Sequence, residues 1–219
     1  MTRAQALDAL LFGASLAEKL KRDGYDILAT GEMGIGNTTT SSAVASVLMG
    51  RSSAEVTGRG AGLSAEGLMR KIDAIKRAIS VNRPDVNDPV DVIAKVGGFD
   101  LAGMTGLFLG AAACKIPVLI DGFISAVAAL AAARLCPDAA GYALATHLSD
   151  EPAARMVLET LGKRPMITAG MRLGEGTGAV AALGLLDAAV AVYTDMSTFD
   201  DIAIDAYQPF DETAGTLPC

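Results

Sequence analysis

Three glycine-rich segments carry the residues whose types and spacing suit chemistry. The first, "TGEMGIGNTTTSS" (30–42), sets Glu32 among backbone N–H donors and hydroxyl side chains. Glycines ahead of a helix expose N–H groups that suit an anion, and Asn37 or Thr38 is expected to cap that helix. The spacing fits neither a P-loop nor GxGxxG, so an ordinary strand–helix turn and an anion cradle are equally good interpretations. Because a carboxylate repels a phosphate, Glu32 favours a ribose hydroxyl or a cationic ring as its neighbour.

The second segment, "GRGAGLS" (58–64), precedes a helix that carries Lys71. One interpretation is a simple turn, with Lys71 on the solvated face of the helix. The other is a second wall of the same anion pocket, with Lys71 as the countercharge.

The third segment, "GMRLGEGTGA" (170–179), places Glu175 between Gly174 and Gly176. At the end of a strand and in a mostly apolar pocket, this glutamate would have a raised pKa and would suit a general base. The alternative is an acid near a helix N-terminus, favoured by the helix macrodipole. The local pattern alone favours that alternative.

Two more polar residues lie at predicted strand ends. His147 is the single histidine; without Cys or His neighbours it makes a poor metal site, and no GxSxG elbow supports a serine hydrolase. We therefore expect His147 to be structural or ligand-orienting, with Ser149 or Asp150 capping a helix that begins near Glu151. Asp121 follows a buried strand, which places it at a turn or, with modest preference, in the pocket.

The elements that position these residues alternate between strands and helices. Strands are expected at 25–30, 115–121, 139–148 and 165–170, and the helix at 65–80 has a clear apolar face. An N-terminal helix is expected to start with a capping box between Thr2 and Gln5. Such alternation predicts an α/β fold with a parallel sheet, helices on both faces, and a ligand beyond the carboxyl ends of the strands.

The composition narrows the function classes. The chain has 219 residues, a net charge of −7, 5% aromatic residues and no Trp, which disfavours nucleic acid as a partner. No uninterrupted apolar run reaches the roughly 18 residues of a membrane span, and the N-terminus lacks the pattern of a signal peptide. Three scattered cysteines indicate reduced thiols in the cytoplasm.

Taken together, the motifs resemble one family, the nicotinate-nucleotide–dimethylbenzimidazole phosphoribosyltransferases of cobalamin nucleotide-loop assembly. The matching segments, in the family's order, are "GEMGIGNTT", "GRGAGL", "DPVDVIAKVGGFDLAGMTGLFLGAA", "IPVLIDGFISAVAAL", "HLSDEP", "MRLGEGTGA" and "DMSTFDDI". The resemblance implies a Rossmann-like parallel sheet with helices on both faces, plus the remnant of a small helical domain. It also implies a cytoplasmic homodimer that needs neither cofactor nor metal.

The resemblance implies a reaction and a set of site residues. The phosphoribosyl group of nicotinate mononucleotide passes to 5,6-dimethylbenzimidazole, giving nicotinate and α-ribazole 5′-phosphate, with Glu175 as the catalytic base. The implied substrate-binding residues are Glu32, Gly34, Ile35, Gly36, Asn37, Thr38, Gly60, Gly62, Lys71, Asp121, Ser149, Leu173, Gly174, Gly176 and Gly178.

The resemblance also implies how the chain is divided. Residues 1–24 are expected to form a helix of the small helical domain or of an interface, residues 25–202 the phosphoribosyltransferase domain, and residues 203–219 a tail. In the family, a substantial segment precedes the point that matches Met1, and it contributes contacts to the benzimidazole. The alternatives are therefore an inactive or purely binding protein for a nucleotide or ribazole, and a base-exchange enzyme for another base.

Overall fold

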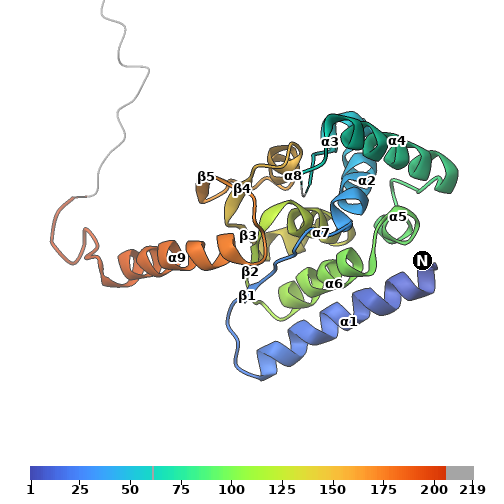
Figure 1. The fold of residues 1–219 in the computed structure, drawn as a ribbon. Helices are drawn as coiled ribbons and strands as arrows, with labels where there is room; N and C mark the ends of the chain where they lie inside the picture. Colours follow the sequence, from blue (N-terminus) through green and yellow to red (C-terminus); the bar gives the residue numbers. More distant parts are fainter. Residues whose placement is uncertain (61, 206–219) are drawn as a thin grey trace, which may run out of the picture. The chain divides into compact units, whose positions relative to one another are not determined.

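The computed structural model describes residues 1–60 and 62–205, where helices and short strands alternate (Figure 1). The helices are α1 (Arg3–Arg22), α2 (Asn37–Met49), α3 (Ser53–Val56), α4 (Ala65–Asn82), α5 (Pro89–Val96), α6 (Phe99–Ala113), α7 (Gly122–Leu135), α8 (Ala154–Thr160) and α9 (Thr177–Asp195), with a 3₁₀ helix at Pro137–Tyr142. The strands are β1 (Leu28–Ala29), β2 (Val118–Ile120), β3 (Ala143–Ala145), β4 (His147–Ser149) and β5 (Ile167–Met171). Most of the expected tail, including Cys219, lies outside the described residues.

The strands form two small parallel sheets. The first has the order β1-β2-β3 and the second pairs β4 with β5. The α/β class with parallel strands is confirmed, but the single strand expected at 139–148 is wrong, because the chain changes partner at Thr146. Up to Ala145 the chain pairs with β2, whereas the carbonyl of Thr146 already accepts from the N–H of Ile167, at 2.9 Å.

The core of the first sheet is apolar and tightly packed. All three residues of β2 are at most 2% exposed, as expected for a parallel strand covered on both faces. Helix α7 packs against β2 and β4, and ten of its residues, half of them alanines, are buried. Small side chains let this helix approach the strands closely.

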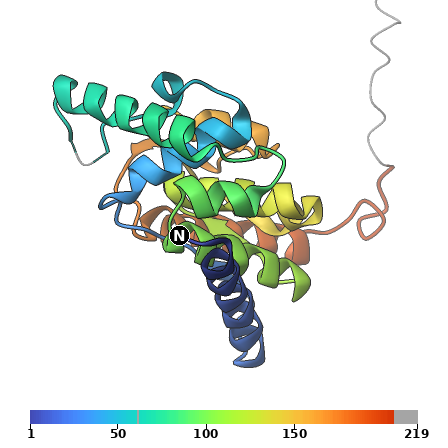
Figure 2. The same cartoon turned by 90° about the vertical axis from the view of Figure 1, so that its right-hand side faces the viewer.

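Helices α1 and α6 lie side by side (Figures 1 and 2) and pack backbone against backbone. A Cβ atom on Gly106 of α6 would lie 1.9 Å from the carbonyl oxygen of Leu10, and one on Gly13 of α1 would lie 1.9 Å from that of Gly103. Contacts this short admit no side chain, so the glycines set the distance between the two helices.

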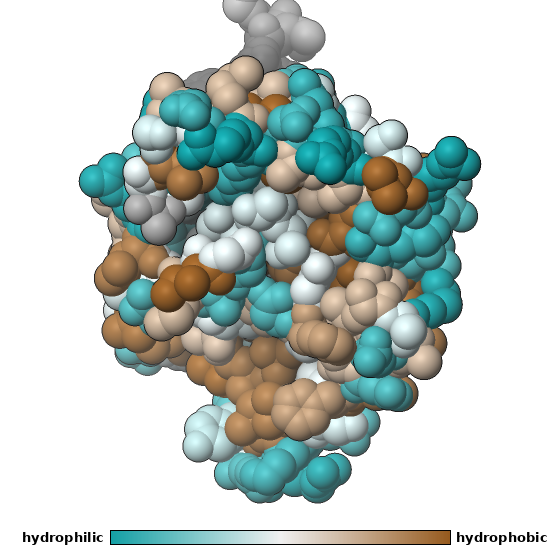
Figure 3. Space-filling model, turned by 45° about the vertical axis from the view of Figure 1, so that its right-hand side comes forward, coloured by the Kyte–Doolittle hydropathy of each residue, from teal (hydrophilic) through white to brown (hydrophobic). Residues whose placement is uncertain are grey.

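The outward side of α1 carries exposed apolar side chains among polar ones such as Asp8 and Ser15. Leu11 is 64% exposed and Phe12 is 69% exposed, and Leu7 and Leu16 are also exposed. Figure 3 shows apolar residues near the lower end of the view, above a hydrophilic edge. Large exposed apolar side chains of this kind are common on surfaces that another polypeptide covers.

Helix α9 is, by length and composition alone, long and apolar enough to cross a membrane. This is weak support for a span, because helices of soluble proteins meet the same criterion and because Asp187 interrupts the apolar sequence. The described residues up to Leu183 form one compact unit, and those from Gly184 form a second.

Candidate active site

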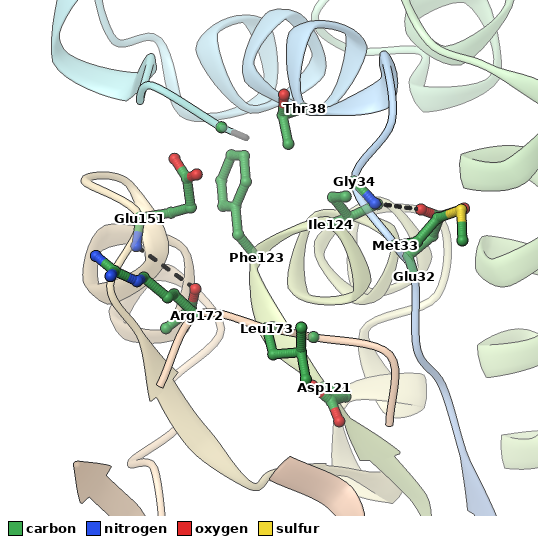
Figure 4. Close-up of a pocket in the computed structure, with 14 residues that line it drawn as sticks. Glu32, Met33, Gly34, Thr38, Asp121, Phe123, Ile124, Glu151, Arg172 and Leu173 are labelled. Atoms are coloured by element: carbon green, nitrogen blue, oxygen red, sulfur yellow. Dashed lines mark hydrogen bonds between the residues drawn. The ribbon is translucent and has the colours of Figure 1, made fainter. Parts of the chain in front are cut away.

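A cavity opens where several strands end, as expected for parallel α/β sheets. Glu32 follows β1, Asp121 follows β2, Ser149 ends β4 and Arg172 follows β5, and all four line the cavity. Figure 4 shows side chains from these different elements arranged around one space. Segments more than 100 residues apart in the sequence therefore meet at one site.

The loop between β1 and α2 forms the first wall. The carboxylate of Glu32 accepts the N–H of Gly34 at 2.9 Å (Figure 4), so one predicted anion donor is already paired with an acid. Helix α2 begins at Asn37 behind Gly36, and no described side chain caps this end. The expected cap by Asn37 or Thr38 is wrong, because the amide of Asn37 donates instead to Asp100, at 2.8 Å. The first turn of α2 therefore has no side-chain cap among the described residues, as is typical of helix N-termini that bind anions.

Residues 58–60 form the second wall, which Lys71 ties to α2. The ammonium of Lys71 donates to the hydroxyl of Thr38 at 2.9 Å and to the carbonyl of Gly58 at 3.0 Å. Lys71 is 7% exposed, so the interpretation that placed it on a solvated face is wrong. Burial lowers the pKa of this ammonium below its usual 10.5, and the Glu151 carboxylate partly offsets the shift.

The loop from Arg172 to Gly176 forms the third wall and is fixed to the first by backbone contacts. The N–H of Glu175 donates to the carbonyl of Glu32 at 3.3 Å. A Cβ atom on Gly31 would lie 2.5 Å from the nitrogen of Gly176, and one on Gly174 would lie 2.8 Å from the same Glu32 oxygen. The two loops therefore approach each other as closely as main chains can.

Glu175 has a backbone conformation that side chains rarely adopt, with φ at 59°. Such strain in a non-glycine residue costs about 1–3 kcal/mol and clusters at functional sites. Helix α9 starts at Thr177, so Glu175 lies two residues before its N-terminus, a position that fits the macrodipole alternative as well as a functional role. The expectation of a mostly apolar pocket around Glu175 is wrong, because Glu175 is exposed and lines a shallow depression beside the cavity, shared with Glu32 and Met33.

The structure brings together about half of the residues expected at the site. Those that line the cavity are Glu32, Gly34, Thr38, Gly60, Asp121, Ser149, Leu173 and Gly174. Others lie behind or beside the wall: Lys71 and Gly178 are buried, and Gly36 and Asn37 form the start of α2. Ile35, at 77% exposed, points to solvent, and Gly62 is exposed in its loop.

Several lining residues were not expected. Met33, Phe123, Ile124, Glu151 and Arg172 also face the cavity, and all are labelled in Figure 4. Glu151 and Arg172 lie inside two motifs that stand out in the sequence. Their charged side chains could therefore have been predicted to face the cavity. Phe123 and Ile124 carry no such signal, because an apolar residue at a helix start resembles a core residue.

The expected helix cap near Glu151 is also wrong. Helix α8 begins at Ala154, behind Ala153, and the hydroxyl of Ser149 accepts the N–H of Glu151 at 3.5 Å. This contact holds the loop after β4 against the cavity rather than starting a helix there.

A sequence model of a protein family, described as Phosphoribosyltransferase, matches residues 1–204. The nicotinate-nucleotide–dimethylbenzimidazole phosphoribosyltransferase of Acetivibrio thermocellus is 56% identical over 95% of this chain and 60% of its own length. The protein of that name from Ruminiclostridium cellulolyticum is 54% identical over 96% of this chain and 60% of its own length.

Solved structures give the same result. The crystal structure of CobT from Thermus thermophilus superposes with a TM-score of 0.87 at 40% identity, covering 94% of this chain and 61% of that one. This chain thus spans about 60% of the length of the relatives it matches. Because the family match runs from residue 1 to residue 204, the chain belongs to the phosphoribosyltransferase family.

Proposed function

We propose that this chain holds the nucleotide-binding and proton-accepting parts of an enzyme that transfers phosphoribosyl groups. The donor is nicotinate mononucleotide, the acceptor is 5,6-dimethylbenzimidazole, and the products are α-ribazole 5′-phosphate and nicotinate. The observation that carries the proposal is the backbone contact between the Glu32 loop and the Glu175 loop at the cavity edge. That contact places an acid with a strained backbone beside a cavity whose other wall is a helix N-terminus.

In the proposed mechanism, one nitrogen of the benzimidazole attacks the anomeric carbon of the ribose. The bond from that carbon to the pyridinium nitrogen breaks, and its electron pair neutralises the ring charge as nicotinate leaves. The carboxylate of Glu175 takes the proton from the other benzimidazole nitrogen. Attack from the face opposite the leaving group inverts the configuration and gives an α-riboside.

The walls of the cavity have distinct roles in this proposal. The first turn of α2 and residues 58–60 hold the phosphate through N–H groups and the Thr38 hydroxyl. Glu32, whose carboxylate accepts the Gly34 N–H, lies next to the ribose and the cationic ring. The apolar side chains of Phe123 and Leu173 provide surface for the planar rings.

A direct assay tests the proposal. The chain is incubated with nicotinate mononucleotide and 5,6-dimethylbenzimidazole, and released nicotinate and α-riboside are separated and quantified. We expect nicotinate and α-riboside to form only when 5,6-dimethylbenzimidazole is added. Tight nucleotide binding without product overturns the catalytic proposal and favours a binding protein, which the exposure of Glu175 also favours. Faster turnover with another base, such as adenine, favours a base-exchange enzyme.

Lys71→Met is expected to weaken the binding of nicotinate mononucleotide about tenfold, because the hydroxyl of Thr38 and the carbonyl of Gly58 lose their charged donor. Isothermal titration calorimetry measures the change in Kd. Lys76→Met is the matched control, since Lys76 is exposed on the same helix. Equal Kd values for the two variants contradict a role for Lys71 in the nucleotide site.

We also propose a cytoplasmic homodimer. The exposed apolar residues of α1 support an interface, since Leu11 and Phe12 present large apolar side chains to solvent. Cys114 and Cys136 are free thiols, which fits a reducing compartment.

A further inference from the structure

Two buried polar residues lie beneath the loop that carries Glu175. His147 is 3% exposed, is the first residue of β4 and does not line the cavity. Asp121 is 2% exposed and follows β2. The Nδ1 atom of the imidazole lies 3.8 Å from Oδ1 of the Asp121 carboxylate. The mechanism proposed above gives His147 no role, yet burying two polar groups together is costly unless their partners are well placed.

The hydrogen bonds around His147 define its protonation. Burial lowers the pKa of the imidazole below its usual 6.5, and the Asp121 carboxylate partly offsets the shift, so the ring is neutral at pH 7. The hydroxyl of Thr146 donates to the carbonyl of Ile120 at 2.7 Å, which commits its one hydrogen. Its oxygen, 3.2 Å from Nδ1, is then an acceptor, so the proton of the ring lies on Nδ1. Nδ1 lies 3.8 Å from the carboxylate, beyond hydrogen-bond distance, and Oδ1 of Asp121 and Nε2 of His147 have no hydrogen-bond partner among the described residues.

The pair contacts the start of α9 directly. The other carboxylate oxygen of Asp121 accepts the N–H of Ala179 at 3.1 Å. The imidazole lies against Gly178, where a Cβ atom would be 1.9 Å from Nδ1. The same two residues thus fix one turn of helix by a hydrogen bond and by a close van der Waals contact.

A short rigid link joins this turn to Glu175. The N–H and the hydroxyl of Thr177 both donate to the carbonyl of Gly174, at 3.1 and 2.7 Å. The N–H of Val180 donates to the carbonyl of Gly176 at 2.9 Å. Glu175 is therefore held from both sides, with little freedom to shift independently of Gly178 and Ala179.

We propose that His147 and Asp121 are positioning residues for the base. The imidazole of His147, 3.8 Å from the Asp121 carboxylate and packed against Gly178, keeps that carboxylate in the orientation in which it holds Ala179, and this sets the place of the Glu175 carboxylate at the cavity edge. The inference rests on the proposed function for the role of Glu175. A displacement of 1 Å in a reacting group lowers turnover about 100-fold, so the pair is expected to affect kcat and not nucleotide binding.

Two nearly isosteric variants test the inference. The nitrogen of Asn in His147→Asn reaches the position of Nδ1, whereas the longer side chain in His147→Gln places its nitrogen where Nε2 lies. We expect His147→Asn to keep kcat within about threefold of the wild type and His147→Gln to lose about 10- to 100-fold, with KM for nicotinate mononucleotide unchanged in both. A purely structural role predicts no difference between the two amides.

A second readout does not depend on turnover. Hydrogen exchange of the Ala179 amide, followed by NMR, is expected to be slow in the wild type and His147→Asn and fast in His147→Gln, since this amide donates to Asp121. Thr146→Val, which removes the hydroxyl that accepts from Nδ1–H and donates to the carbonyl of Ile120, is expected to speed that exchange too. Thr105→Val is its control, because Thr105 is equally buried and donates to the carbonyl of Ala128, within a different part of the fold.

The outcomes separate the two proposals. A wild-type chain without turnover overturns the proposed function, and the Ala179 exchange rates still decide whether the pair fixes the loop. Equal kcat and equal exchange in the Asn and Gln variants overturn the positioning inference while the assay remains positive. A rise in KM that matches the fall in kcat also overturns it, because that result assigns the pair to substrate binding. If His147→Gln does not fold, the comparison of Thr146→Val with Thr105→Val decides between the two roles.

Discussion

Glu175→Gln is expected to lower kcat for phosphoribosyl transfer about 1000-fold, within the range for loss of a general base. The amide keeps the size and polarity of the carboxylate but does not take a proton from the attacking benzimidazole. Because the backbone N–H of Glu175, and not its side chain, donates to Glu32, the loop is expected to keep its place. Release of nicotinate under saturating substrates measures the change.

Nucleotide binding is expected to survive this substitution, with Kd within about twofold of the wild type, since the proposed phosphate site lies on other walls. Glu66→Gln is a suitable control, because Glu66 is exposed on α4. Unchanged turnover in Glu175→Gln refutes the base role. A large loss of nucleotide affinity in the same variant assigns Glu175 to binding and not to proton transfer.

Gly106→Ala is expected to lower the free energy of unfolding by about 3 kcal/mol, the upper range for overpacking. The added methyl would lie 1.9 Å from the carbonyl oxygen of Leu10 and 2.7 Å from its carbon, and backbone atoms do not rotate out of the way. Helices α1 and α6 must then separate and lose contacts along their length. Urea unfolding followed by circular dichroism measures the loss.

Gly184→Ala provides the matched comparison, since Gly184 lies in helix α9 and a Cβ atom there has nothing within 4 Å. Removing a glycine from a helix interior stabilises by about 0.5–1 kcal/mol, so this variant is expected to be at least as stable as the wild type. Two variants with the same midpoint of unfolding are incompatible with close packing of α1 on α6.

The sequence predicts local structure well where neighbouring residues decide it. The capping box of α1 is confirmed: the hydroxyl of Thr2 accepts from the Gln5 N–H at 3.2 Å, and the Gln5 side chain accepts from the Thr2 N–H at 2.9 Å. The apolar face of α4 is also confirmed, with Ile72 and Ile75 buried. Each of these features depends on residues within one or two helical turns.

The sequence misleads where distant segments decide the outcome. The buried face of α1 consists of Ala6, Leu10, Gly13 and Ala17, whereas Leu7 and Leu11 are exposed, because α6 approaches too closely for large side chains along most of this face. The change of strand partner at Thr146 and the burial of Lys71 likewise arise from pairings across the fold. Strand-end glycines and acids were enough to locate the cavity, whereas its apolar lining was not distinguishable from core.

The backbone contact between the Glu32 and Glu175 loops has a consequence for how this site tolerates change. Because main-chain atoms make this contact, replacing the side chain of Glu175 changes the chemistry of the site but leaves the contact between the two loops in place. Gly31 and Gly174 show the opposite behaviour, since even one methyl at either position would push the loops apart. In a survey of all substitutions, Gly31 and Gly174 would therefore be intolerant positions for folding, whereas substitutions of the Glu175 side chain would leave the fold intact.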